Sequence, residues 1–129
     1  MGFSLLKVRY WVQIENKLRK DALDVHCMGD AGAHHEDLGL VKVPNSGNFN
    51  WTFKSRFWMQ LKYRCNLTWP NHGRKEIIAF YDERKFVDKR CGGRHCFWKA
   101  TDDGIYLYHI QKKKYIFAET WDKLSYNYN

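Results

Sequence analysis

Residues 59–69 alternate apolar and polar side chains with a period of two, which constrains the fold more than any other feature of the sequence. The odd positions carry Met59, Leu61, Tyr63, Cys65, Leu67 and Trp69, and the even positions carry Gln60, Lys62, Arg64, Asn66 and Thr68. Successive side chains of a strand point to opposite faces of its sheet. The segment therefore predicts a strand with one buried face and one face toward solvent.

The same alternation recurs along the chain. It places on single strand faces the sets Val8, Tyr10, Val12 and Ile14; Leu23, Val25 and Cys27; and Phe49, Trp51 and Phe53. Further strands are expected at 40–43, 76–81, 96–100, 105–110 and 115–118. Turn-forming residues at 45–48, 70–73 and 102–104 separate strands, and each turn is expected to close a hairpin. No segment shows a sustained helical stripe, so the chain predicts an all-β antiparallel sandwich or barrel of seven or eight short strands.

Length and composition indicate one soluble domain. A chain of 129 residues can bury roughly two-thirds of its unfolded surface, and 8 Phe, 8 Tyr and 6 Trp argue against disorder. No stretch approaches the ~18 uncharged apolar residues of a membrane span. The net charge of +8 favours attraction to nucleic acid, acidic polysaccharides, phospholipid headgroups or an acidic receptor surface, although the cations are spread along the chain.

Four cysteines, Cys27, Cys65, Cys91 and Cys96, contain no C-x-x-C pair. The spacing of Cys91 and Cys96 could suit zinc, but no second close pair completes four ligands. An even number of cysteines in a small domain favours two disulfides and an oxidising compartment, so we expect a secreted protein without metal or cofactor. Residues 1–6 contain too few apolar side chains to form a signal peptide, so we expect the sequence to be a mature form. We expect a single domain over residues 1–129.

Four cysteines allow three disulfide pairings. A bridge between Cys91 and Cys96 would close only a short loop containing two glycines and constrain little of the chain. The pairing of Cys27 with Cys96 and of Cys65 with Cys91 is therefore preferred, and the other two pairings stay open.

Eight short motifs along the chain resemble those of the plant self-incompatibility S-protein homologues. The matching residues are Val25-His26-Cys27, Asp37-Leu38-Gly39, Trp51-x-Phe53, Phe57-Trp58 leading to Cys65, Phe80-Tyr81-Asp82, Cys91 with Cys96-x-Trp98, Asp103-Gly104-Ile105-Tyr106 and Trp121. The resemblance spans residues 8–122. It implies a secreted β-sandwich with two disulfides and no catalysis, and a role as an extracellular signalling ligand for a cell-surface receptor.

A rigid sandwich can carry a recognition surface on its loops, because loops vary without cost to the core. The first choice for the contact surface is the charged loop 82–94, with Asp82, Glu83, Arg84, Lys85, Asp88, Lys89, Arg90 and Arg94. The turn 70–75 is the second choice. Both could also be ordinary solvated connections.

Two N-glycosylation sequons occur, Asn50-Trp51-Thr52 and Asn66-Leu67-Thr68. Each places its asparagine on the polar side of a predicted strand, where a glycan could point outward. Occupancy is expected at Asn66 more than at Asn50, whose sequon contains a bulky Trp.

Two other classes of function remain open. His34, His35, Glu36 and Asp37 could supply acid and base groups to a ribonuclease-like defence enzyme, but adjacent strand residues point to opposite sides, which favours a non-enzymatic surface. His26 is expected to be a strand histidine with a local hydrogen bond. Alternatively, Trp11, Tyr106 and Tyr108 could join basic residues in a polyanion-binding surface, for nucleic acid or acidic glycans; the competing expectation for these rings is burial.

Overall fold

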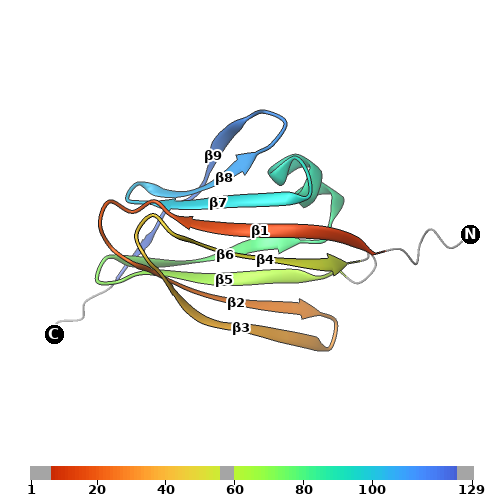
Figure 1. The fold of residues 1–129 in the computed structure, drawn as a ribbon, viewed down its shortest axis with the longest axis horizontal. Helices are drawn as coiled ribbons and strands as arrows, with labels where there is room; N and C mark the ends of the chain where they lie inside the picture. The colour runs from red at the N-terminus through yellow and green to blue at the C-terminus, as the bar shows by residue number, and fades with distance from the viewer. Residues whose placement is uncertain (1–6, 56–59, 125–129) are drawn as a thin grey trace, which may run out of the picture.

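Two five-stranded sheets pack face to face in the computed structural model, which describes residues 7–55 and 60–124 (Figure 1). Sheet A contains, in spatial order, β4 (Asn48–Ser55), β1 (Val8–Asn16), β7 (His95–Thr101), β8 (Gly104–His109) and β9 (Lys114–Glu119). Sheet B contains β10 (Asp122–Lys123), β6 (Gly73–Tyr81), β5 (Lys62–Trp69), β2 (Leu23–Ala31) and β3 (His34–Val43). The predicted all-β sandwich is confirmed.

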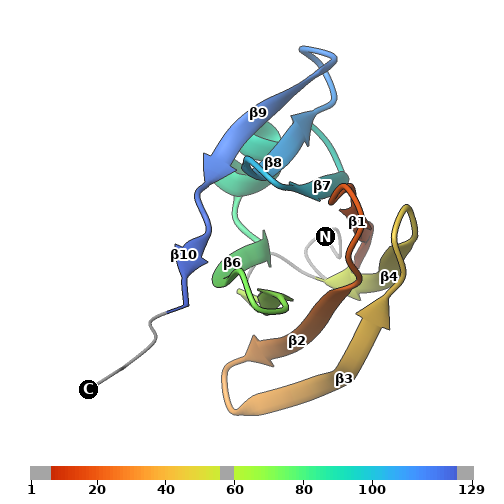
Figure 2. The same cartoon turned by 90° about the vertical axis from the view of Figure 1, so that its left-hand side faces the viewer.

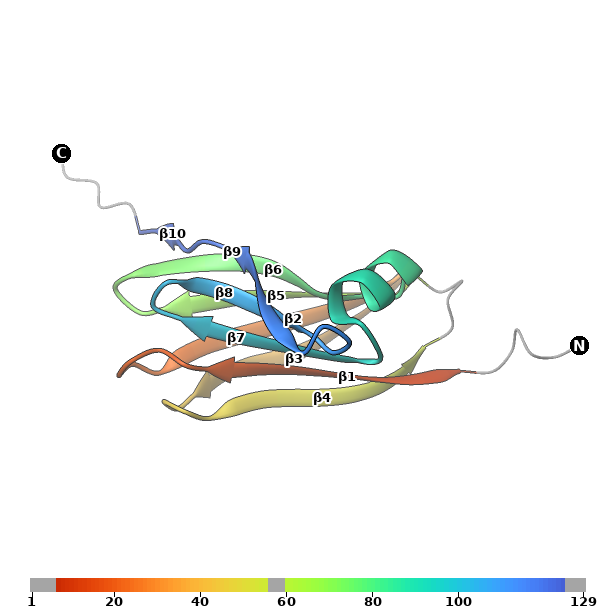
Figure 3. The same cartoon turned by 90° about the horizontal axis from the view of Figure 1, so that it is seen from above.

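Neighbouring strands run antiparallel with one exception. β1 pairs with β7 in parallel, with Trp11 opposite His95 and Asn16 opposite Ala100. A view along the strands shows the two sheets as separate layers (Figure 2). A short π-helix, η3 (Lys85–Cys91), carries the chain from β6 in sheet B to β7 in sheet A, at the end of the sandwich where β1 begins (Figure 3).

The core lies between the sheets and follows the alternation of the sequence. Its fully buried residues include Val12, Ile14, Trp98, Ala100 and Ile105 from sheet A, and Leu23, Val25, Leu67 and Ala79 from sheet B. The indole Nε1–H of Trp98 donates to the backbone oxygen of Ala79 at 3.0 Å, which joins the two layers. The hydrogen bond satisfies the one polar group of this side chain, and burial removes its apolar surface from water.

One glycine is required by the packing of sheet B. Gly29 on β2 lies opposite Tyr63 on β5, and a Cβ added to Gly29 would stand 2.5 Å from the Tyr63 ring. The ring fills the space that a side chain would occupy. Its hydroxyl donates to the Glu36 carboxylate at 2.8 Å, and burial, followed by this hydrogen bond, raises the pKa of Tyr63.

Two of the three predicted hairpins are confirmed, at 70–73 between β5 and β6 and at 102–104 between β7 and β8. The third is wrong, because the turn at 45–48 leads from β3 in sheet B to β4 in sheet A. The turn is held by β1 instead: the Asn16 N–H donates to the Gly47 oxygen at 2.9 Å, and the Ser46 N–H donates to the Asn16 oxygen at 3.1 Å. Turn residues indicate that the chain reverses, but they do not say which strand it pairs with next.

The preferred disulfide pairing is also wrong. The bridges join Cys27 to Cys65 and Cys91 to Cys96. The first links directly opposed residues of β2 and β5, both on the core side, with Cα atoms 4.0 Å apart. The argument from loop length failed because local geometry, and not the size of the closed loop, decides which sulfur atoms meet.

Candidate functional site

The first-choice contact surface, residues 82–94, is a helical corner and not the open loop that was expected (Figure 3). The corner connects the end of β6 to the start of β7. Phe86, Val87 and Cys91 on its inner side are buried, which ties the short helix to the sandwich. No helical stripe was visible in the sequence, because a segment of seven residues is too short to show one.

Two glycines end the helix and turn the chain back. Gly92 has φ of 71°, a left-handed conformation that glycine adopts without steric cost, and a Cβ there would stand 2.7 Å from the His109 ring. The Gly93 N–H donates to the Val87 oxygen at 3.1 Å. The turn brings Cys91 and Cys96 to a Cα separation of 5.0 Å, so the second disulfide fastens the C-terminal end of the helix to β7.

The solvent side of the corner is predominantly cationic. Its exposed residues are Glu83, Arg84, Lys85, Asp88, Lys89, Arg90 and Arg94. Arg84 approaches Asp88 at 4.0 Å, one helical turn away, which is a weak pair at an exposed site. The Arg90 guanidinium lies 5.2 Å from the centre of the Phe86 ring, so its stem covers the buried side of the helix while its charge stays accessible.

Asp82, which was expected at the contact surface, is buried instead. Its carboxylate accepts a hydrogen bond from the Ser55 hydroxyl at 2.5 Å, which ties the corner to the end of β4. Burial raises the pKa of Asp82, and the Ser55 hydrogen bond opposes that shift. Burial and the nearby Asp82 charge in turn raise the pKa of Tyr10. Asp82 therefore supports the corner from beneath and does not face a partner.

Two shallow depressions flank this carboxylate. One, of about 470 Å³, is lined by Gln60, Tyr81, Asp82, Glu83 and Arg84. The other, of about 400 Å³, shares its last three residues and continues to Tyr10, Asp88 and Arg94. Both open to solvent beside the helix, so a partner that contacts the cations could also place side chains into them.

The second-choice surface, residues 70–75, includes the β5–β6 turn, at the end of the sandwich opposite the helical corner (Figure 3). There the ring of His72 stacks on Trp69 at 4.3 Å, and the Trp69 Nε1–H donates to Asp21 at 2.8 Å. Lys75 bonds to Asp122 at 3.2 Å. The polar groups of this turn are therefore largely engaged with neighbouring loops.

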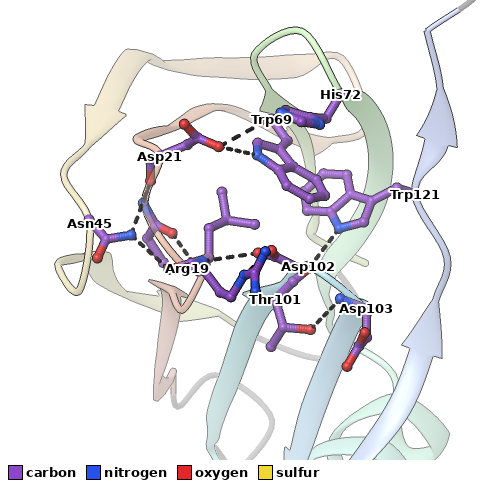
Figure 4. Close-up of polar contacts among 11 residues, drawn as sticks. Arg19, Asp21, Asn45, Trp69, His72, Thr101, Asp102, Asp103 and Trp121 are labelled. Carbon is purple, nitrogen blue, oxygen red and sulfur yellow. Dashed lines mark hydrogen bonds and ion pairs between the residues drawn. The ribbon is translucent and has the colours of Figure 1, made fainter.

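The rest of that end joins the two sheets. The Arg19 Nε–H donates to Asp102 at 3.2 Å, and the Trp121 Nε1–H donates to the Thr101 oxygen at 2.8 Å (Figure 4). These contacts lock the β1–β2 connection and the chain before β10 onto the β7–β8 turn. The arrangement favours a structural role for this end over a free recognition surface.

The histidines of the β2–β3 ribbon form separate pairs with carboxylates. The ring of His26 lies 2.7 Å from Asp37, and that of His35 lies 2.5 Å from Asp30. The Gly39 N–H and then His26 lower the pKa of Asp37. His34 is exposed at the start of β3, as is Glu36. Within residues 7–55 and 60–124, no group of three or more His, Cys, Asp or Glu side chains is placed to hold a metal ion.

The two sequon asparagines lie on different faces of the molecule. Asn50 is exposed on the outer side of β4 in sheet A, and Asn66 is exposed on the outer side of β5 in sheet B. Both side chains point away from the core, so both sites have the geometry that a glycan needs.

Burial of Trp11, Tyr106 and Tyr108 was expected against a second sheet or a loop; burial against the second sheet is wrong, because all three face outward from sheet A. They lie on the outer side of sheet A, where Trp11 is 37% exposed and the two tyrosines are partly exposed. The sequence did not show that Phe97, Tyr115 and Phe117 join them. Tyr115 and Phe117 are brought there by the pairing of β9 with β8, which places them opposite Tyr108 and Tyr106.

Comparisons with known proteins agree on one group. Residues 11–121 match the family described as plant self-incompatibility protein S1. S-protein homolog 1 of Arabidopsis thaliana is 25% identical over 118 residues, covering 90% of this chain and 74% of the relative. Self-incompatibility protein S1 of Papaver rhoeas is 24% identical over 103 residues, covering 72% and 70%.

A solved structure shows the same fold. It is a self-incompatibility protein homologue from what is described as a widespread family of small, highly stable, secreted plant proteins. It superposes on this chain with a TM-score of 0.61 at 16% identity, covering 92% of this chain and 98% of the solved one. In the described part of this chain, no helix is long and apolar enough to cross a membrane.

Proposed function

The chain belongs to the plant self-incompatibility protein S1 family, and from this premise we propose that it is a secreted, non-enzymatic ligand that a cell-surface receptor recognises through the helical corner. The observation that carries the proposal is the cationic corner itself. Four exposed cations, at positions 84, 85, 89 and 90, lie on a short helix fixed by a disulfide and by buried side chains.

A fixed surface suits recognition because little conformational entropy is lost when a partner binds. The corner is held at both ends: Asp82 bonds to Ser55, and Cys91 is joined to Cys96. The backbone positions that carry the cations are therefore fixed in the free protein. Opposite charge on a receptor would speed association and select the partner.

The proposal is tested with a charge-reversed variant, in which Arg84, Lys85, Lys89 and Arg90 are all replaced by Glu. A matched control replaces four exposed cations elsewhere, Lys20, Lys42, Arg64 and Lys123, by Glu. Both variants carry the same net charge, so non-specific attraction to a negative cell surface falls equally. Binding of labelled protein to plant cells is measured as saturation curves at two ionic strengths, before and after mild surface proteolysis.

We expect saturable, protease-sensitive binding that the corner variant loses by at least ~10-fold, while the control variant keeps most of it. Equal loss in both variants would remove the corner from consideration and leave only net charge. Binding that survives proteolysis of the cell surface would exclude a protein receptor.

A further inference from the structure

The outer side of sheet A carries seven ring-bearing residues, which we call the aromatic face: five rings in one chain of contacts and a separate pair that Lys99 links to them. Its members are Trp11, His95, Phe97, Tyr106, Tyr108, Tyr115 and Phe117. Ring centroids are 4.2 Å apart for Trp11 and His95, 5.5 Å for His95 and Phe97, and 6.3 Å for Phe97 and Tyr108. Beyond Tyr108, the group continues to Tyr115 at 5.0 Å, on the edge strand β9.

This face is unusual because the outer side of a sandwich sheet is normally polar. Trp11 is 37% exposed, Tyr115 36% and Phe117 50%. A contiguous exposed apolar surface of this kind marks a binding site more often than chance exposure does. The rings stand on strands, so their positions are set by the sheet.

Cations accompany the rings. The Lys99 ammonium lies among them, 4.1 Å from the centre of the Tyr115 ring and 5.3 Å from that of Tyr106. Arg9 and Lys54 are opposite each other on β1 and β4, and both are exposed beside Trp11 on the outer side. Glu15 is the acidic residue of β1 on this side; it lies opposite Lys99 of β7, and its carboxylate is 3.5 Å from the Lys17 ammonium, which offsets its charge.

Neutral hydrogen-bonding groups complete the surface. Gln13 and Asn50 are opposite each other on β1 and β4, on the same outer side as Trp11. Thr52 is opposite Trp11, and its hydroxyl accepts from Arg9 at 3.0 Å. Rings, cations and amides therefore share the outer side of sheet A.

We propose that the aromatic face binds an acidic oligosaccharide built from uronic acid units. A pyranose ring offers C–H groups on one face for contact with aromatic rings, hydroxyls for amide side chains, and a carboxylate for a cation. Lys99, held between two tyrosine rings, supplies that cation within the apolar surface, where a charge-assisted hydrogen bond is strongest.

The ring geometry favours a sugar over single-stranded nucleic acid. Phe97 and Tyr108, Tyr108 and Tyr115, and Tyr106 and Phe117 meet edge to face, with interplanar angles of 77°, 66° and 80°. Bases need parallel ring faces on which to stack in succession. A run of successively stacked bases therefore does not fit these three pairs, whereas one exposed ring is enough for C–H contact with one sugar.

The test uses the disulfide-bonded protein without glycan at Asn50 and a homo-oligomer of galacturonic acid as the probe. Calorimetry measures the dissociation constant of this oligomer from the native protein and from a double variant, Trp11→Ala combined with Tyr115→Ala. A matched control replaces Met28 and Leu40, exposed on sheet B, by Ala. A second variant, Lys99→Gln, removes the charge and keeps a hydrogen-bonding donor on a side chain one atom shorter.

We expect the paired ring variant to raise the dissociation constant by ~10-fold or more, and Lys99→Gln to raise it by several-fold, with no change in the control. The fully methyl-esterified oligomer should bind more weakly than the acid form to the native protein, and this difference should shrink in Lys99→Gln.

Unchanged binding in the paired ring variant would overturn the proposal. A single-stranded oligonucleotide that bound more tightly, with the same dependence on Trp11 and Tyr115, would assign the face to nucleic acid instead. Equal affinity for dextran sulfate and for the uronate oligomer, lost equally with salt, would reduce the interaction to net charge. The helical corner is not part of this face, so either proposal can fail alone.

Discussion

Asp82 is a charged residue that holds the helical corner in place without being exposed on its surface. Sequence reasoning placed Asp82 among the contact residues because its neighbours are charged, yet it is buried and bonded to Ser55. The signal that separates it from Glu83 is its place directly after the buried end of β6, and only the path of the chain reveals that. The cations that follow were predicted correctly as exposed because they lie on the outer side of a helix whose inner side is apolar.

The raised pKa of Asp82 gives a pH dependence with a definite sign. Burial raises this pKa above the ordinary value of 3.8, so the folded state binds more protons than the unfolded state at pH values just above 3.8. The contribution of Asp82 to the free energy of unfolding therefore falls as the pH rises through that window. Asp82→Asn does not titrate and can still accept the Ser55 hydrogen bond through its amide oxygen.

We expect the stability of Asp82→Asn relative to the native protein to increase as the pH rises from about 3 to 7. Urea unfolding of both proteins at a series of pH values measures this difference. A difference that is constant over the range, or that falls with pH, would contradict the assigned cause.

At the scale of strands and helices, the alternation of apolar and polar residues predicted where most strands lie. It did not predict which strands pair or where the chain passes from one sheet to the other. β5 begins at Lys62 and β2 at Leu23, close to where the pattern placed them, because each strand buries one face. Residue 59, expected to begin the β5 strand, lies outside the described residues. Alternation is a local property, so it could not show that β1 joins β7, that the turn at 45–48 changes sheet, or that Cys27 faces Cys65.

The two disulfides are expected to differ in what they stabilise. By loop-closure entropy, the Cys27–Cys65 bridge, which spans 38 positions, contributes about 4 kcal/mol, and the Cys91–Cys96 bridge, which spans 5, contributes about 2 kcal/mol. Replacing both cysteines of one bridge by Ser should therefore lower the free energy of unfolding more for the first pair.

Loss of the Cys91–Cys96 bridge should instead act locally, by releasing the end of η3. Chemical denaturation measures stability, and amide hydrogen exchange at residues 85–93 measures local opening. Faster exchange confined to the corner is the expected result for the Cys91–Cys96 variant. Equal exchange in the two variants would show that this bridge does not hold the helix in place.

Over the whole molecule, the structural contacts and the two proposed binding surfaces occupy separate regions. The helical corner lies at one end of the sandwich, and the β5–β6 and β7–β8 turns, with the loop contacts around Trp69 and Trp121, lie at the other (Figure 3). The aromatic face lies on the outer side of sheet A. The sequence pointed to the corner through its charges and to part of the aromatic face through Trp11, Tyr106 and Tyr108. The full face could not be predicted, because it combines side chains from four strands whose order is set by long-range pairing.

This separation gives opposite expectations for the two glycosylation sites. A glycan on Asn50 would lie over the outer side of sheet A, whereas one on Asn66 would extend from sheet B. Protein made in a secretory host, with either Asn50→Gln or Asn66→Gln, provides the comparison once intact mass confirms the remaining glycan. We expect uronate binding to be lost when Asn50 alone carries the glycan and kept when Asn66 alone does. Equal binding by both glycoforms would contradict the position assigned to the acidic sugar.

The parallel pairing of β1 with β7 also limits when sheet A can assemble during synthesis of the chain. β1 is an interior strand of sheet A, between β4 and β7, and β4 can pair with one of its edges early in synthesis. Its other edge must wait for a strand that begins at His95, most of the chain later, and until then it presents open backbone groups. Folding on such distant pairing is slow. The growing chain is therefore most vulnerable to aggregation before its last third has emerged.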